Sequence, residues 1–213
     1  MLLVLVAVAR AAIPPLYPQP EPADIAAAFE AYAKGQGKSG PATQVRCAPL
    51  ADGVVLCFRY VHDGRLAYVT QSEVVTWHAD EQALVAAATA RAMTMVDERF
   101  EQTPIADTPG AVYWVSRKGD GLDGAAFLDP RRLERIAGGP VVVAMPAANT
   151  LLFWRPDGGE LDRIVAIGVR RMADASDHPI SDRVYRWDGT VWRVWGQAVP
   201  KDASGSGSGS GTR

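Results

Sequence analysis

The most regular pattern of hydrophobic and polar positions lies between Gly139 and Trp195. Residues 141–145 are apolar and stand between two prolines, and a second run of bulky residues follows at 150–154. Short continuous apolar runs are typical of strands that are buried on both faces. Because residues 146–149 are few enough to form a turn, the pattern predicts a hairpin of two buried strands.

The spacing of hydrophobic positions changes after Glu160. Apolar residues then recur every three or four positions, as on the buried stripe of a helix. Arg170 and Arg171 near the far end suit the negative end of the helix dipole. The pattern predicts a helix over about residues 158–173. The positions that form its apolar stripe are Leu161, Ile164, Val165, Gly168, Val169 and Met172.

A second hairpin is predicted at the end of this region, with Asp188-Gly189 as a type I′ turn between residues 181–187 and 190–195. This register places Tyr185 opposite Trp192 and assigns one face to the core, which holds Tyr185, Trp187, Trp192 and Val194. The other face carries Arg186, Arg193 and Trp195. Such a face forms either an ordinary cation–π contact or a binding patch.

Upstream patterns are weaker but indicate further helices and hairpins. They predict helices at 24–34, at 81–100 and from Asp129 to Gly138. They also predict a hairpin of 54–61 with 66–70, a strand at 111–116 and a polar surface loop at 117–124. Together with the later elements, they predict an α+β fold. Antiparallel β-hairpins pack with about four helices, and the chain ends in the order strand, strand, helix, hairpin.

Cys47 and Cys57 are the chain's two cysteines, and they flank Ala51-Asp52-Gly53, which has the composition of a three-residue hairpin loop. A hairpin centred on Asp52 brings the two cysteines opposite each other, within reach of a disulfide. Two reduced structural thiols are the alternative. A catalytic thiol is disfavoured, because neither cysteine adjoins a histidine or a helix start.

The first residues have the pattern of an export signal. Residues 2–9 are apolar, and small residues at Ala7, Ala9 and Ala11 offer cleavage sites, so residues 1–12 are predicted to be a signal peptide. The pattern departs from the norm in having no basic residue before the apolar run, and a buried N-terminal strand is the alternative. The run is too short to span a bilayer. Residues 13–22, with five prolines, are predicted to be an extended linker.

Composition and charge narrow the organisation of the remaining chain. With 213 residues, 48% of them hydrophobic and 22% charged, the chain has the composition of a globular protein. We expect one α+β domain over 23–199, with two sub-lobes that divide near 103–110 as an alternative, and a flexible Ser/Gly tail over 200–213. A net charge of -2 gives no reason to expect nucleic acid as a partner.

Few residues have the side-chain types and the spacing of a known catalytic or metal-binding site. The histidines at positions 62, 78 and 178 have no second ligand at metal spacing, and no metal or cofactor is implied. The loop around Asp120 and Asp123 lacks the pattern of a calcium site. Asp177 next to His178 is the most suggestive pair, because a carboxylate can orient an imidazole. A turn before the last hairpin explains the same two residues without catalysis.

The order of these segments resembles a known family. The segments that carry the resemblance are Pro140-Val-Val-Val-Ala-Met-Pro146, Leu151-Leu-Phe-Trp154, the amphipathic helix and Pro179-Ile-Ser-Asp-Arg-Val-Tyr-Arg-Trp-Asp-Gly189. They are similar to the YtpQ-like family of bacterial proteins of unknown function, best over 133–195 and extending back to about Tyr68. The resemblance implies no activity or catalytic residues. It also implies a cytoplasmic protein, from which the signal and the cysteine pair depart.

These features favour a non-catalytic binding or interaction domain that is exported to the cell envelope, periplasmic or secreted, with a cytoplasmic location as the alternative. Its expected ligand is a protein, a peptide or a glycan. The alternative function is a hydrolase that uses the turn at Asp177 and His178. The candidate functional residues are Asp177, His178, Arg186, Arg193 and Trp195.

Overall fold

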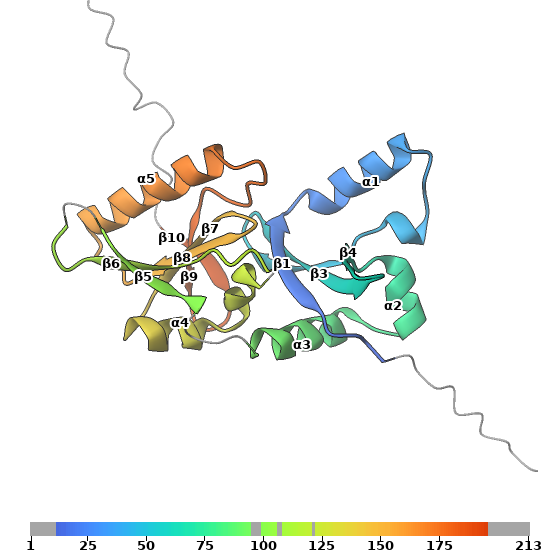
Figure 1. Ribbon diagram of the computed structural model, residues 1–213, viewed down its shortest axis with the longest axis horizontal. Helices are drawn as coiled ribbons and strands as arrows, with labels where there is room; N and C mark the ends of the chain where they lie inside the picture. Colours follow the sequence, from blue (N-terminus) through green and yellow to red (C-terminus); the bar gives the residue numbers. More distant parts are fainter. Residues whose placement is uncertain (1–11, 95–98, 106–107, 121, 196–213) are drawn as a thin grey trace, which may run out of the picture.

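The computed structural model describes residues 12–94, 99–105, 108–120 and 122–195. In these residues the chain forms two antiparallel sheets with helices packed around them (Figure 1). The predicted α+β class with antiparallel hairpins is confirmed. Among the described residues, no helix combines the length and hydrophobicity that a bilayer span requires.

The N-terminal sheet has the order β1-β3-β2, with β4 paired to β3. Its strands are β1 (Tyr17–Pro22), β2 (Cys47–Ala51), β3 (Val54–His62) and β4 (Arg65–Tyr68). The predicted linker 13–22 is therefore wrong in its second half, which is strand β1. Every second residue of β1 is a proline, at positions 18, 20 and 22. The backbone nitrogens that lack a hydrogen therefore all face away from β3, and the residues between them can donate to it. An edge strand tolerates such an arrangement.

Cys47 and Cys57 form the predicted disulfide, with a Cα–Cα distance of 4.0 Å. The register of β2 and β3 pairs these two cysteines directly, as the hairpin prediction required. The turn itself is shorter than predicted, because Ala51 already pairs with Val54. An irregularity between Pro49 and Ala51 restores the opposition of the cysteines.

The helices of the N-terminal half are α1 (Ile25–Gly35), the 3-10 turn η1 (Pro41–Thr43), α2 (Gln71–Trp77) and α3 (Glu81–Ala92). Helix α2 was not predicted. It begins with a capping box between Thr70 and Glu73. Helix α3 is shorter than the predicted 81–100, and the Thr94 hydroxyl donates to the Arg91 carbonyl at 2.7 Å where it ends. The predicted apolar positions 95 and 96 lie outside the described residues.

The second sheet has the order β10-β9-β7-β8-β6-β5. Its strands are β5 (Glu101–Pro104), β6 (Val112–Ser116), β7 (Val142–Ala147), β8 (Thr150–Trp154), β9 (Val184–Trp187) and β10 (Trp192–Trp195). Strand β7 lies inside this sheet, and Val142, Val143 and Ala144 are fully buried. The predicted hairpin of two buried strands is confirmed as β7 and β8.

Helices cover both faces of the six-stranded sheet (Figure 1). Helix α5 (Glu160–Asp174) packs Leu161, Val165 and Val169 against one face. The 3-10 helix η3 (Asp123–Leu128) and helix α4 (Pro130–Ala137) cover the other, where Leu133 is fully buried. Alternate residues of each buried strand therefore meet different helices.

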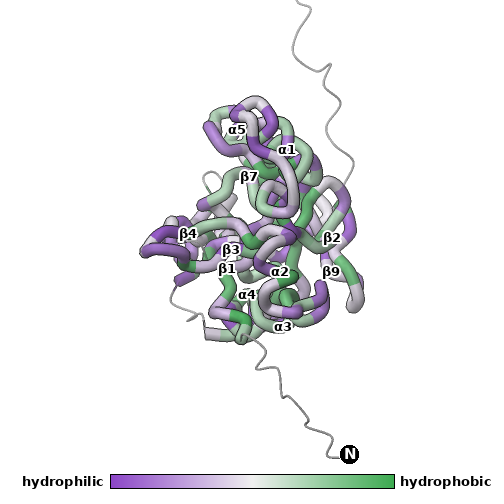
Figure 2. Tube along the Cα trace, turned by 90° about the vertical axis from the view of Figure 1, so that its right-hand side faces the viewer, coloured by the Kyte–Doolittle hydropathy of each residue, from purple (hydrophilic) through white to green (hydrophobic). Residues whose placement is uncertain are grey.

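One hydrophobic cluster joins the two sheets and contains Phe127 of η3, Tyr185 of β9 and Val54 of β3, while Leu56 and Phe58 of β3 belong to a separate cluster with α3. Figure 2 shows hydrophobic segments in the interior near β7, while the hydrophilic end of β4 lies at the periphery. Along the sequence, the last strand of the N-terminal sheet ends at Tyr68 and the first strand of the second sheet begins at Glu101. This boundary precedes the loop at 103–110 where sub-lobes were expected to divide.

The last hairpin has a different register from the predicted one. Trp187 pairs with Trp192 instead of Thr190, and the Asp188 N–H donates to the Val191 carbonyl at 3.1 Å. The turn is thus centred on Gly189 and Thr190, with Gly189 at φ 100°. A shift of two positions leaves each residue on its predicted face. Val194, however, is exposed and does not lie in the core as predicted.

Candidate ligand-binding site

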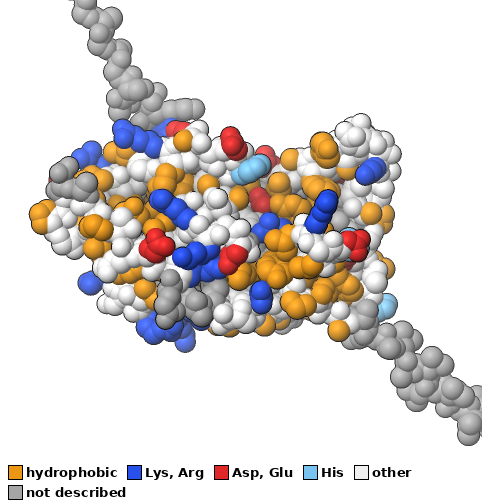
Figure 3. All heavy atoms as spheres, viewed as in Figure 1, with side chains coloured by type: hydrophobic (Ala, Val, Ile, Leu, Met, Phe, Trp, Pro, Cys, Tyr) orange, Lys and Arg blue, Asp and Glu red, His pale blue; other side chains and the backbone are white. Residues whose placement is uncertain are grey.

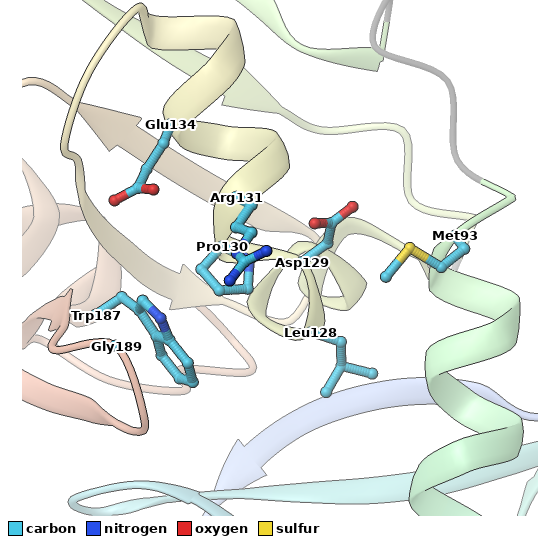
Figure 4. A pocket seen from close by; sticks show the side chains of 8 residues that line it. All are labelled: Met93, Leu128, Asp129, Pro130, Arg131, Glu134, Trp187 and Gly189. Carbon is cyan, nitrogen blue, oxygen red and sulfur yellow. The ribbon is translucent and has the colours of Figure 1, made fainter.

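A pocket of about 470 Å³ lies between the end of α3, the start of α4 and the turn of the last hairpin. Its volume is in the range of small-molecule sites, roughly 300–1,000 Å³. Figure 4 shows the side chains around it, with the Trp187 ring opposite the side chains of α4. The lining residues are Met93, Leu128, Asp129, Pro130, Arg131, Glu134, Trp187 and Gly189.

The first turn of α4 supplies the polar wall. Asp129 caps the helix, accepting from the Arg132 N–H at 3.2 Å, and its other oxygen lies 3.3 Å from Arg132 Nε. Asp129 is therefore already engaged. Arg131 and Glu134 follow one turn apart, and in the part of the chain that the structure describes neither side chain has a hydrogen-bond or ion-pair partner. These two groups are available to a ligand.

Trp187 supplies the aromatic wall. Its ring meets Trp192 edge to face, with 5.4 Å between ring centroids. Trp192 is buried, and its Nε1 donates to the Phe127 carbonyl at 2.8 Å. Trp187 was predicted to lie in the core, but it is only partly buried and also lines the pocket. A tryptophan held by a fixed neighbour presents its surface without much loss of side-chain entropy.

The predicted surface of the last hairpin is occupied by internal contacts. The Arg186 guanidinium lies 4.8 Å from the centroid of the Trp195 ring, which is the first of the two arrangements that the sequence predicted for this face. Arg193 Nε lies 2.5 Å from Asp188. Backbone N–H groups of the turn, followed by Arg193, lower the pKa of Asp188 to about 2. None of Arg186, Arg193 and Trp195 lines the pocket.

Asp177 and His178 lie in the turn between α5 and β9, and both are exposed. The His178 N–H donates to Ser176 Oγ at 3.0 Å, and its carbonyl accepts from Ala148 at 3.2 Å. The first bond lies within the turn, and the second attaches the turn to the residue that follows β7. Neither residue lines the described pocket.

A second group of polar side chains lies on the N-terminal sheet. Glu21 is 8% exposed and accepts from the Tyr68 hydroxyl at 2.5 Å, while Arg59 donates to Gln19 at 2.6 Å. Burial raises the pKa of Glu21, although Tyr68, Arg59 and His178 oppose this shift. Figure 3 shows basic, acidic and histidine side chains near the middle of one face. Sequence reasoning missed Glu21, because it fell within the predicted linker.

The loop at 117–124 is not the simple surface loop that was predicted. Asp123 is 1% exposed and accepts from Arg99 at 2.8 Å and from Ser116 at 2.5 Å. The backbone N–H groups of Lys118 and Gly119 also donate to it, at 3.1 and 2.8 Å. A carboxylate with four donors is saturated, so this network stabilises the loop and leaves no oxygen free for a metal ion.

Over the described residues, no group of three or more histidine, cysteine, aspartate or glutamate side chains is placed to hold a metal ion. Comparison with known proteins gives no identification: no protein-family model, no curated protein and no solved structure matches the chain. The resemblance to the YtpQ-like family stays a prediction from the quoted segments.

Proposed function

We propose that this chain is a non-catalytic binding domain exported to the cell envelope, and that it holds its ligand in the pocket between α3, α4 and the last hairpin. The observation that carries the proposal is the pocket itself. It combines an accessible tryptophan with two charged side chains that have no described partner. Convergent polar groups beside an aromatic surface are characteristic of ligand sites.

The compartment is supported by two separate features. The Cys47–Cys57 disulfide is of a kind that persists in the periplasm or outside the cell and is rare in the cytosol. The apolar stretch 2–9 with its small-residue cleavage sites has the pattern of a secretory signal. Export places the disulfide in an environment that maintains it.

The export part is tested by fractionating native cells. We expect the protein outside the cytoplasm, shortened at its N-terminus after Ala9 or Ala11, with no free thiols. Mass spectrometry of the purified native protein measures both the cleavage and the oxidation state. Recovery of the protein wholly in the cytoplasm, unprocessed, would contradict export.

The binding part is tested by thermal unfolding of the full chain against a library of small molecules. A ligand of the native pocket raises the unfolding temperature through mass action. We expect this increase to disappear in Trp187→Leu and to persist in Trp195→Leu, a matched change in the same hairpin outside the pocket. If no compound stabilises the protein, or if stabilisation survives Trp187→Leu, the pocket is not the binding site.

The alternative function is a hydrolase using Asp177 and His178. The charge of His178 acts on Glu21, but in the described residues neither the Asp177 nor the His178 side chain makes a hydrogen bond or an ion pair that would orient it for catalysis. Both side chains are exposed in a turn whose hydrogen bonds are explained by attachment to β7. The variant His178→Ala tests this alternative. If the variant loses the protein's function in vivo or its turnover of a ligand, the hydrolase becomes the favoured function.

A further inference from the structure

We infer that the pocket takes a neutral saccharide, with one face of a sugar ring against Trp187 and its hydroxyl groups bonded to Arg131 and Glu134. This inference rests on the proposed function and specifies its ligand class. A pyranose ring has an apolar face of C–H groups and a rim of hydroxyls. The pocket has the complementary arrangement, with an aromatic surface beside a donor and an acceptor.

The charges of the wall favour a neutral ligand. Arg131 and Glu134 have opposite signs and lie three residues apart, so they project from neighbouring positions of α4. An anion beside Arg131 also approaches Glu134 and Asp129, and a cation beside Glu134 also approaches Arg131. Figure 4 shows Arg131 and Glu134 on the Trp187 side of α4. A ligand with hydroxyls satisfies both groups without a net charge.

The hydrogen-bonding capacities also match hydroxyl groups. Arginine only donates and an ionised glutamate only accepts, whereas a hydroxyl does both. Adjacent hydroxyls of one ring can therefore accept from Arg131 and donate to Glu134 at the same time. Hydrogen bonds to charged groups are stronger than those between neutral groups. Both side chains lack described partners, so binding does not need to break an existing bond.

The surroundings are less suited to an extended peptide or a helix. Peptides that add a strand need a sheet edge, and peptides that bind as helices need a long apolar groove. The pocket is bounded by the start of α4, the end of α3 and a turn, and a single tryptophan forms its aromatic surface. Pro130 has no backbone N–H to offer, and the Arg132 N–H is already bonded to Asp129. Recognition therefore depends on side chains.

The test uses isothermal titration of the full chain with three trisaccharides: maltotriose, cellotriose and the trimer of N-acetylglucosamine. We expect at least one to bind. Arg131→Met and Glu134→Gln should each weaken binding about tenfold, the usual result of losing one charge-assisted hydrogen bond. Arg117→Met and Glu30→Gln are the matched controls, since both side chains are exposed and lie outside the pocket. Circular dichroism checks that each variant is folded.

Trialanine is titrated in parallel, because its two termini form a zwitterion that pairs with the same two side chains. If trialanine binds, is sensitive to Arg131→Met, and no saccharide binds, the saccharide inference is overturned while the pocket remains a binding site. Saccharide binding that is unaffected by both pocket variants also overturns it. The absence of any binding overturns it as well. Export and the binding of other compounds to the pocket are tested by the separate experiments described for the proposed function.

Discussion

Glu21 is a carboxyl group with little access to water on the N-terminal sheet. It receives a hydrogen bond from Tyr68, yet burial outweighs that bond and the charges of Arg59 and His178, so its pKa is raised. Asp123, also buried, has more hydrogen-bond donors, since two backbone N–H groups, Arg99 and Ser116 all donate to it. Two acidic residues with similar exposure therefore have different environments because of their neighbours.

The raised pKa of Glu21 predicts a specific dependence of stability on pH. The unfolded chain releases this proton near the ordinary value of 4.5, whereas the folded protein retains it to higher pH. Folding takes up a proton between these values, so the contribution of Glu21 to the free energy of unfolding falls as pH rises above 4.5. Glu21→Gln should remove this fall, as measured by urea unfolding at a series of pH values.

Glu73 and Asp120 do not interfere with that measurement. Burial opposes the change, but hydrogen bonds from Thr70 lower the pKa of Glu73, and those from Arg99 and Leu122 lower the pKa of Asp120. Their contributions to stability are lost below the ordinary values of 4.5 and 3.8, on the acidic side of the Glu21 interval. Glu30→Gln, an exposed change on α1, is the control. Equal pH profiles for Glu21→Gln and the wild type would contradict the prediction.

Sequence reasoning could not identify the residues of the pocket. Arg131 has the pattern of a solvated helix face, and Trp187 has that of a core position. Both residues line one pocket although 56 positions separate them in the sequence, and no local pattern predicts such a contact. A cation–π contact between Trp195 and an arginine was one of two predicted possibilities, and Arg186 makes it in the observed register, where its partner Arg193 lies two positions from Trp195. Local geometry was predictable, and long-range packing was not.

Among the elements, the two hairpins show when turn chemistry determines register. The cysteine hairpin had the correct pairing, although an irregularity near Leu50 compensated for a shorter turn. The register predicted for the last hairpin was wrong, because Asp188 precedes the two central residues of the turn instead of being one of them. Its carboxylate accepts from the N–H groups of Thr190 and Val191, at 2.9 and 2.8 Å, which favours a turn one residue later. An Asp-Gly pair therefore fits either register.

The disulfide within the first hairpin makes a stability prediction. It closes a loop between residues ten positions apart, for which loss of chain entropy in the unfolded state gives about 2–3 kcal/mol. The double variant Cys47→Ala, Cys57→Ala should be less stable by about this amount, measured by urea unfolding. Wild-type protein treated with a reductant is the control, because it loses the bond while keeping both side chains. Two reactive thiols in the unreduced, denatured wild type would contradict the disulfide.

In the whole molecule, Gly124 marks where η3 meets both sheets. A Cβ atom at this position would lie 2.2 Å from Pro20 Cδ of β1 and 2.9 Å from Met145 Cε of β7. The sequence suggested a loop glycine, because the strand β1 that crowds it was assigned to a linker. The joint between the sheets was therefore missed together with β1, although most helices and strands were predicted from periodicity.

Gly124→Ala should destabilise the protein by about 1–3 kcal/mol, the usual cost of overpacking a core. The methyl group meets a proline ring on one side, which cannot move without shifting β1. Gly168→Ala in α5 is the matched control, since no atom lies within 4 Å of its Cβ position, and alanine is favoured over glycine in a helix by up to about 1 kcal/mol. Thermal unfolding measures both. Equal stability of Gly124→Ala and the wild type would show that the joint is loosely packed.

The tip of the β2–β3 hairpin has a consequence for how the chain assembles. Its Asp52 receives a hydrogen bond from Arg183 through its side chain and one from the Tyr185 hydroxyl through its carbonyl, at 3.1 Å. These partners follow it by 131 and 133 residues. At about 5–20 residues per second, synthesis of the chain between Asp52 and these partners takes roughly 7–27 s. Closure of the joint between the sheets belongs to the final stage of folding, after β9 has been translated.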